Sequence, residues 1–195
     1  MRIVRYKIGG RIMSEVIVIT SGKGGVGKTT TTANVGTGLA KLDQKVVLID
    51  TDIGLRNLDV VRGLETRIVY TLVDVTTPEV SAIRDADRII GLLEANEIKQ
   101  TDLIVNRIRM DMVESGNMMS IDDVVEILAI NIIGAVPDDE NIVISTNQGE
   151  PCVGDSSLAG QAYMNICRRV MGEEVPFLDL KVKTGFLGKL KNLFK

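Results

Sequence analysis

The stretch SGKGGVGKTT, residues 21–30, holds two lysines where a phosphate-binding loop usually needs only one. It follows the apolar, β-branched run VIVIT at 16–20, which is typical of a buried parallel strand. We expect a helix to follow, from Lys28 to about Leu42. A Gly-x-x-x-x-Gly-Lys-Thr pattern between a strand and a helix is the setting that a Walker A loop requires. The stretch therefore predicts a site for nucleotide phosphates.

The chemistry of such a loop assigns a role to each kind of residue. Glycines let backbone N–H groups converge on phosphate oxygens, and the N-terminus of the helix adds partial positive charge. Lys28 is expected to neutralise the β- and γ-phosphates, and the Thr29 hydroxyl to bind Mg²⁺. The predicted cofactors are therefore ATP and Mg²⁺. The predicted phosphate-binding residues are Gly22, Lys23, Gly24, Gly25, Val26, Gly27, Lys28, Thr29 and Thr30.

Further apolar runs alternate with helical stretches along the chain. The runs KVVLID (45–50), DLIVN (102–106) and IIGAVP (132–137) are expected to be strands of the same buried kind. Helices are expected over 79–95 after Pro78, over 121–129 behind a Ser120 N-cap, and over 157–171 behind Ser156. This alternation predicts an α/β fold: an open, mostly parallel sheet with helices on both faces and the ligand at the carboxyl ends of the strands.

Composition and charge exclude several classes of protein. A chain of 195 residues, 45% of them hydrophobic, is long enough to form one compact domain. Its formal net charge of -3 argues against a general nucleic-acid binder, which would show a basic excess. Cys152 and Cys167 are too few for a zinc site or a disulfide framework. No secretory segment is recognisable, so we expect a cytoplasmic protein.

Lys23 goes beyond the standard motif. The pattern Lys-Gly-Gly-x-Gly-Lys-Thr resembles the deviant Walker A loop of the MinD/ParA class of ATPases. In that class the early lysine reaches across a dimer to the partner's nucleotide, so the resemblance implies a homodimer when ATP is bound. A second cation on the γ-phosphate, supplied by a partner, makes stabilisation of the transition state depend on dimerisation. The alternative is a solvated loop lysine.

Two carboxylates follow the expected second strand, in DTDIGLRNLD at 50–59. Asp50 and Asp52 are candidates to hold Mg²⁺ through water or to orient the attacking water, and the alternative is a helix-capping or loop aspartate. The longer stretch DTDIGLRNLDVV resembles switch I of the septum site-determining ATPases, the MinD family. That resemblance implies that Asp52 is catalytic together with Lys23 and Lys28, while Asp50 supports the Mg²⁺ site.

The resemblance to the MinD family extends over nearly the whole chain from Met13 to Lys195. It rests on TTPEVSAIRDADRIIGLLEAN, LIVNRIRMDMV, MMSIDDVVEILAINIIGAVPDD and SLAGQAY. It implies that four residues surround the adenine ring: Asn106, Arg107, Pro137 and Asp138. Asn106 is expected to hydrogen-bond the base edge, and Arg107 to lie over the ring. From the residues alone, each is an ordinary loop residue at the end of a strand.

One departure from the family pattern bears on activity. Val75 is followed directly by Thr76, whereas the family has a long segment between the two matching parts. That segment carries a helix, strands and switch II, an Asp-x-Pro-Ala-Gly turn beside the γ-phosphate, and no such motif occurs in this sequence. The lost strand would pair next to the strand of the Walker A loop. We therefore expect a sheet that lacks part of the usual one, with a gap at its centre or a rearrangement.

Three charged residues stand on the helix expected after Pro78: Arg84, Asp85 and Asp87. Charge patterning alone favours a solvated helix face with local ion pairs. The resemblance implies instead that this surface binds the partner proteins MinC and MinE, at or near the dimer cleft.

The last residues, KVKTGFLGKLKNLFK at 181–195, contain five lysines and no acid. A helix over 185–195 would carry an apolar stripe flanked by lysines, which is the form of an interfacial helix on anionic lipid. The resemblance implies the same, and the alternative is a helix docked on the protein's own core. The predicted membrane-binding residues are Phe186, Leu187, Lys189, Leu190, Lys191, Leu193 and Phe194.

These observations divide the chain into a basic leader at 1–12 outside the fold, an ATPase domain at 13–180 and a membrane-targeting segment at 181–195. We expect an ATP-hydrolysing protein on the inner face of the cell membrane that helps to position the division septum. One alternative is a nucleotide-gated membrane-binding module with little hydrolysis, because switch II is absent, and another is an inactive deletion product. A ParA-type DNA-partition ATPase is disfavoured, so no nucleic-acid partner is expected, and the cysteines do not suggest a cluster-binding iron protein.

Overall fold

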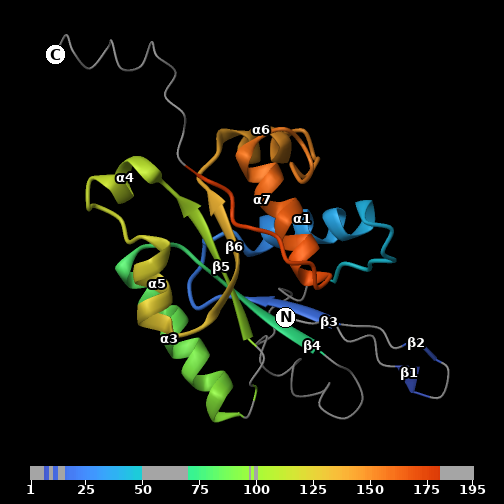
Figure 1. Cartoon of the computed structure of the whole chain (residues 1–195), viewed down its shortest axis with the longest axis horizontal. Helices are drawn as coiled ribbons and strands as arrows, with labels where there is room; N and C mark the ends of the chain where they lie inside the picture. Colours follow the sequence, from blue (N-terminus) through green and yellow to red (C-terminus); the bar gives the residue numbers. More distant parts are fainter. Residues whose placement is uncertain are drawn as a thin grey trace, which may run out of the picture.

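The computed structural model describes residues 7–8, 11–12, 16–49, 70–96, 98 and 101–180. Within these ranges the chain forms one four-stranded parallel sheet in the order β3-β4-β5-β6 (Figure 1). The strands are β3 (Val16–Thr20), β4 (Tyr70–Thr76), β5 (Thr101–Ile108) and β6 (Asn131–Pro137). Two short strands, β1 (Lys7–Ile8) and β2 (Arg11–Ile12), form a separate antiparallel pair.

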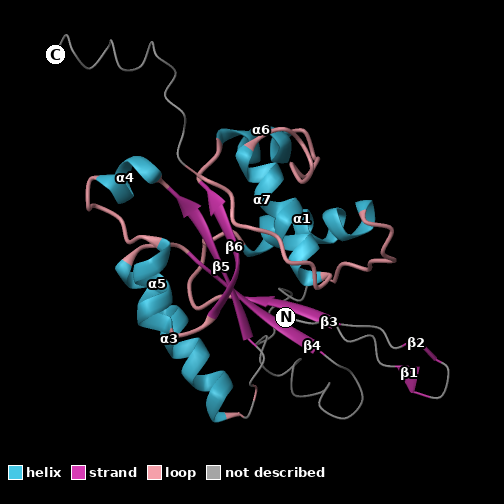
Figure 2. Cartoon of the chain, in the orientation of Figure 1, coloured by secondary structure: helices cyan, strands magenta, loops and turns pink. Residues whose placement is uncertain are grey.

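Helices cover both faces of this sheet (Figure 2). On one face lie α1 (Lys28–Lys41) and α7 (Leu158–Val170), around a core that includes Val73, Tyr163 and Ile166. On the other lie α3 (Val80–Ala95) and α5 (Ile121–Leu128), around a core that includes Ile83 and Leu103. Two further helices, α4 (Met110–Glu114) and α6 (Glu140–Asn147), follow β5 and β6 in the chain. The predicted α/β fold is confirmed.

Local signals explain where two of the helices begin. Ser120 caps α5: its Oγ accepts a hydrogen bond from the Asp123 N–H at 3.1 Å, and the Asp123 carboxylate accepts one from the Ser120 N–H at 2.8 Å. This reciprocal pair is a capping box. At α7, the Ser157 hydroxyl accepts from the Gly160 N–H at 3.0 Å. The cap predicted at Ser156 is therefore wrong by one residue.

The strand predicted at 45–50 is wrong for its described part. Residues 45–49 lie outside every helix and strand, and the side chains of Val47 and Ile49 are 82% and 75% exposed. A strand needs a neighbouring edge with which to exchange hydrogen bonds. Among the described residues, β3 pairs with β4 alone, and the sheet runs from β3 to β6 without a gap. Within the described residues there is thus no gap at the centre of the sheet, and β4 lies next to the strand that precedes the two-lysine loop.

Burial should decide how much each isoleucine contributes to stability. Ile166 in α7 is fully buried, whereas Ile127 in α5 is 51% exposed. We expect Ile166→Ala to lower the free energy of unfolding by about 2–5 kcal/mol, because it leaves a cavity between α7 and the sheet. The matched change Ile127→Ala should cost about 0.5 kcal/mol or less. Urea denaturation followed by circular dichroism measures both, and equal losses would contradict the placement of α7.

Candidate functional site

The phosphate loop, residues 21–27, connects the end of β3 to the start of α1. It turns sharply at Gly25 and Gly27, whose φ angles are 79° and 105°, a region that only glycine adopts readily. Gly27 is also the N-cap of α1, and it offers no side chain to the first N–H groups of the helix. Those donors are therefore left to face an anion, as at other phosphate-binding helix N-termini.

Ser21 closes the loop upon itself. The ammonium of Lys28 donates a hydrogen bond to Ser21 Oγ at 2.8 Å, and Ser21 Oγ donates to the carbonyl of Lys23 at 2.8 Å. Thr29 is exposed in the first turn of α1, beside the lysine. Lys28, predicted to neutralise phosphate, and Thr29, whose hydroxyl is predicted to bind Mg²⁺, thus both lie where the loop meets α1. Sequence reasoning did not single out Ser21.

Lys23, the additional lysine of the loop, contacts the start of α3. Its ammonium donates hydrogen bonds to Glu79 Oε2 at 3.1 Å and to Ser81 Oγ at 3.0 Å. The two charged side chains are 37% and 55% exposed, so this ion pair contributes at most about 1 kcal/mol. Lys23 is therefore held weakly at the surface by residues that sequence reasoning missed.

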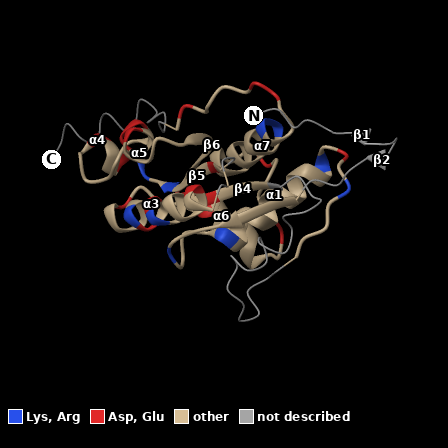
Figure 3. Ribbon diagram, turned by 90° about the horizontal axis from the view of Figure 1, so that it is seen from below, with Lys and Arg blue, Asp and Glu red and all other residues tan. Residues whose placement is uncertain are grey.

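The residues predicted to bind partner proteins lie on a helix that contacts the phosphate loop. A Cβ atom on Gly22 would come within 2.5 Å of the Asp85 carbonyl carbon, so α3 packs directly against the loop. Arg84 and Asp87 are exposed, and Asp85 forms an ion pair with Arg88 at 3.4 Å. Figure 3 shows residues of both signs of charge along α3.

Asn106 and Pro137, two of the four residues predicted to surround adenine, are buried. Asn106 donates from Nδ2 to the Val26 carbonyl at 2.8 Å, while its Oδ1 has no partner among the described residues. A Cβ on Gly27 would collide with this amide. Asn106 thus braces the phosphate loop and keeps one acceptor free beside it.

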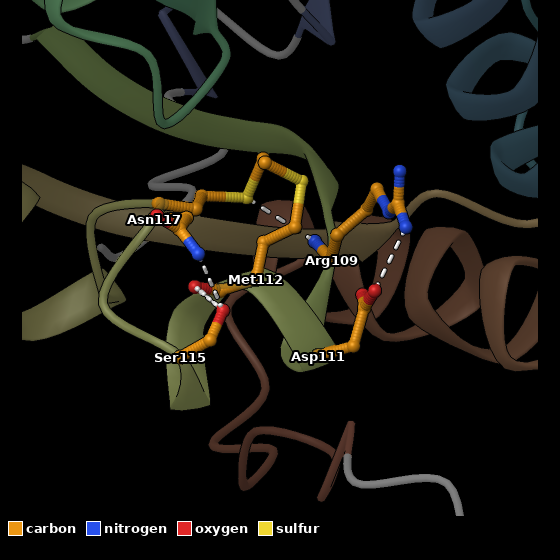
Figure 4. Close-up of polar contacts among 6 residues, drawn as sticks. Arg109, Asp111, Met112, Ser115 and Asn117 are labelled. Atoms are coloured by element: carbon orange, nitrogen blue, oxygen red, sulfur yellow. Dashed lines mark hydrogen bonds and ion pairs between the residues drawn. The ribbon is translucent and has the colours of Figure 1, made fainter.

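The other two predicted base-contacting residues, Arg107 and Asp138, are exposed and line one cavity of about 750 Å³. Arg107 adopts a left-handed φ of 57° at the point where β5 is irregular. The cavity lies between the start of α3 and the segment after β5. Figure 4 shows part of that segment, where Arg109 pairs with Asp111 at 2.7 Å and Asn117 donates to Ser115 at 3.0 Å.

A buried acid in β4 is the feature of the site that sequence reasoning missed. Asp74 is fully buried, and neither of its carboxylate oxygens has a hydrogen-bond partner among the described residues. Burial raises the pKa of Asp74 to about 7. The nearby Val75 N–H, which does not form a hydrogen bond with the carboxylate, and the charge of Lys28 both lower this pKa, but by less than burial raises it. The β-branched run IVYTLVDV at 68–75 was the available signal for this strand.

Several predicted site residues lie outside the described part of the chain. They are Asp50 and Asp52, and the whole membrane-targeting segment 181–195. Their predicted roles therefore stay predictions. Within the described residues, none of the helices has the length and apolar character to cross a bilayer.

The site suits a Mg²⁺-nucleotide better than a free metal ion. The described residues contain no group of three or more acidic, histidine or cysteine side chains that would hold a metal by themselves. Mg²⁺ usually takes one or two carboxylates, retains several waters and is completed by the phosphates of its ligand. The orphaned oxygens of Asp74 and the exposed Thr29 hydroxyl fit that chemistry. Mg²⁺ bound there would neutralise charge between the nucleotide phosphates.

The parallel sheet and the loop between β3 and α1 define a P-loop nucleotide-binding protein. Residues 17–152 match the CobQ/CobB/MinD/ParA nucleotide binding domain family. The septum site-determining protein MinD of Synechocystis is 41% identical over 247 residues, covering 86% of this chain and 93% of that protein. MinD of Bacillus subtilis is 40% identical, covering 93% of this chain and 98% of that protein. The chain belongs to the MinD family of septum site-determining proteins, whose class consists of ATPases.

Solved structures agree with this assignment. The MinC:MinD cell division protein complex of Aquifex aeolicus matches with a TM-score of 0.74 and 39% identity, covering 87% of this chain and 99% of that chain. MinD of Pyrococcus horikoshii, solved with Mg-ADP, shares the fold with a TM-score of 0.60 at 18% identity, over 80% of this chain and 96% of that one. The 247-residue match to the Synechocystis protein exceeds the 195 residues of this chain, so that relative has residues without a counterpart here.

The raised pKa of Asp74 predicts how stability depends on pH. Because the folded state holds this proton more tightly than the unfolded chain, Asp74 contributes most below about pH 4 and loses its contribution as pH rises to about 7. Relative to Asp74→Asn, the wild type should lose about 1.4 kcal/mol of unfolding free energy per pH unit between roughly pH 5 and pH 7. Urea denaturation without nucleotide, in EDTA, measures this difference. Parallel pH curves for the two proteins would contradict it.

Proposed function

We propose that this protein binds and hydrolyses ATP, dimerises when ATP is bound, and thereby collects on the membrane to help position the division septum. Membership of the MinD family and the nucleotide-binding domain support this proposal. The loop supports it physically, because Ser21 already holds Lys28 over a helix N-terminus with no side-chain cap. Little rearrangement is then needed to exchange the hydroxyl for a phosphate.

The position of Lys23 is the observation that supports an ATP-dependent dimer. Its ammonium lies at the surface on Glu79 and Ser81, outside the group formed by Ser21 and Lys28. An exposed ion pair of this kind is cheap to break. In the proposed dimer, Lys23 leaves Glu79 and contacts the γ-phosphate in the partner's site. A cation at the γ-phosphate is stabilised far more than by the exposed ion pair, because negative charge develops there in the transition state.

We also propose MinC and MinE as partners at the exposed charges of α3. Arg84 and Asp87 face solvent on the helix whose backbone at Asp85 packs against Gly22. A movement of the phosphate loop on nucleotide binding would therefore be transmitted directly to the exposed charges of α3. The Aquifex MinC:MinD complex, at 39% identity, supports MinC as a partner.

The membrane step rests on the lysine-rich segment 181–195. A helix of about eleven residues is marginal in water, so a single copy should bind lipid weakly. Two copies held in one dimer make the second insertion intramolecular, which raises avidity by about 10² to 10⁴-fold. ATP-dependent dimerisation would thus become ATP-dependent residence on anionic membrane.

Replacing Lys23 tests the link between nucleotide and membrane. We expect wild-type protein to co-sediment with anionic liposomes in ATP but not in ADP, with phosphate released in the same tubes. Lys23→Ala should still bind nucleotide, through Lys28, but its pelleting in ATP should fall to the ADP level. Lys45→Ala removes an equally charged, exposed residue away from the loop and should behave as wild type.

Each arm of this experiment has an outcome that counts against the proposal. Unchanged recruitment of Lys23→Ala would rule out its action across the dimer. ATP-dependent pelleting without phosphate release would favour a nucleotide-gated membrane-binding module, which the absence of an Asp-x-Pro-Ala-Gly turn already suggests. A sample without nucleotide dependence and without a cooperative unfolding transition would point to an inactive deletion product.

A further inference from the structure

Asp74 is a buried acid without a partner among the described residues, and such a group lowers the stability of the fold. A carboxylate buried without a hydrogen bond or a counter-ion costs several kcal/mol, and proteins normally pair such a group or place it at a metal. The other buried acid of the described sheet, Asp102, is paired: it accepts a hydrogen bond from Asn131 Nδ2 at 2.5 Å. Neither carboxylate oxygen of Asp74 has a partner among the described residues. Of these two buried acids, Asp74 alone is therefore orphaned.

The register of the sheet places Asp74 beside the phosphate loop. It is the partner of Thr20, the last residue of β3, so its side chain stands next to the point where the loop begins. Its neighbours Val73 and Val75 pack toward α1 and α7, so Asp74 faces the other side, where α3 meets Gly22. The charge of Lys28, in the first turn of α1, lowers the pKa of Asp74 by less than burial raises it.

Lys28 cannot serve both the acid and the nucleotide. Its ammonium is already hydrogen-bonded to Ser21, and a bound nucleotide would draw it to the phosphates. When that happens, the charge of Lys28 is engaged by the phosphates, and Asp74 still has no hydrogen-bond partner among the described residues. A divalent cation that arrives with the nucleotide would replace this charge, and one carboxylate is enough when phosphates and waters complete the shell.

We propose that Asp74 is the acidic residue that holds the Mg²⁺ of the bound nucleotide, through a water molecule, together with the hydroxyl of Thr29. This inference rests on the proposed nucleotide site, and it assigns the metal to a residue of β4. The strand next to the phosphate loop thus supplies the carboxylate in a chain that has no Asp-x-Pro-Ala-Gly turn.

The test measures how tightly the nucleotide complex holds Mg²⁺, with no need for turnover. Full-length protein is saturated with a fluorescent ADP analogue in EDTA, and Mg²⁺ is then titrated in. Asp74→Asn should weaken the apparent Mg²⁺ affinity of the complex by at least about tenfold while leaving ADP affinity in EDTA unchanged. Asp102→Asn removes the paired buried acid of the neighbouring strand β5 and should change neither quantity.

The possible outcomes separate this inference from the proposed function. Wild-type Mg²⁺ affinity in Asp74→Asn, or an equal loss of ADP affinity in EDTA, would overturn the assignment of Asp74 while leaving nucleotide binding intact. Failure of the wild type to bind ADP at all would reject both. Should Asp74→Asn not show a cooperative unfolding transition, Asp74→Val, which suits a buried strand, takes its place with the same expected loss.

Discussion

The parallel pairing of β3 with β4 is the constraint on which the rest of the site depends. It fixes Thr20 opposite Asp74, so the end of the strand that feeds the phosphate loop is set against a buried acid. It also carries the chain from Thr76 into α3, whose backbone at Asp85 then closes upon Gly22. The phosphate loop, Asp74 and α3 are therefore positioned by one ladder of backbone hydrogen bonds, and a shift of one residue would turn Asp74 toward α1 and α7.

Within that frame, the two lysines are held by contacts of different strength. Lys28 is half-buried and bonded to the hydroxyl of Ser21, which in turn ties back to the Lys23 carbonyl. The Lys23 side chain is tied only to exposed groups on α3. The inner cation is thus preorganised for the chain's own ligand, while the outer one costs little to release. This difference in how firmly Lys28 and Lys23 are held is consistent with the proposal that Lys23 acts on the nucleotide of a partner subunit.

Much of the fold could be predicted from periodicity and caps, because those signals are local. The strand at 16–20, the glycines of the loop and the capping box at Ser120 all depend on neighbours in the sequence. Pairing is not local, and there the predictions were wrong or incomplete. Residues 45–49 have a strand-like composition but lack a partner among the described strands, and β4 was overlooked because Asp74 interrupts an apolar run. The buried acid beside the phosphate loop was therefore missed together with the strand that carries it.

Arg169 in α7 attaches the segment that follows this helix to the sheet, which determines where a mechanical force on that segment would act. Its guanidinium donates to the carbonyls of Ile133, Val175 and Pro176, and it lies 4.1 Å from the centroid of the Phe177 ring. This clamp fixes the segment that leads to the C-terminal end onto β6, the edge of the described sheet opposite β3. A pull on the end of the chain would thus be taken up at the β6 edge, three strands away from the nucleotide loop.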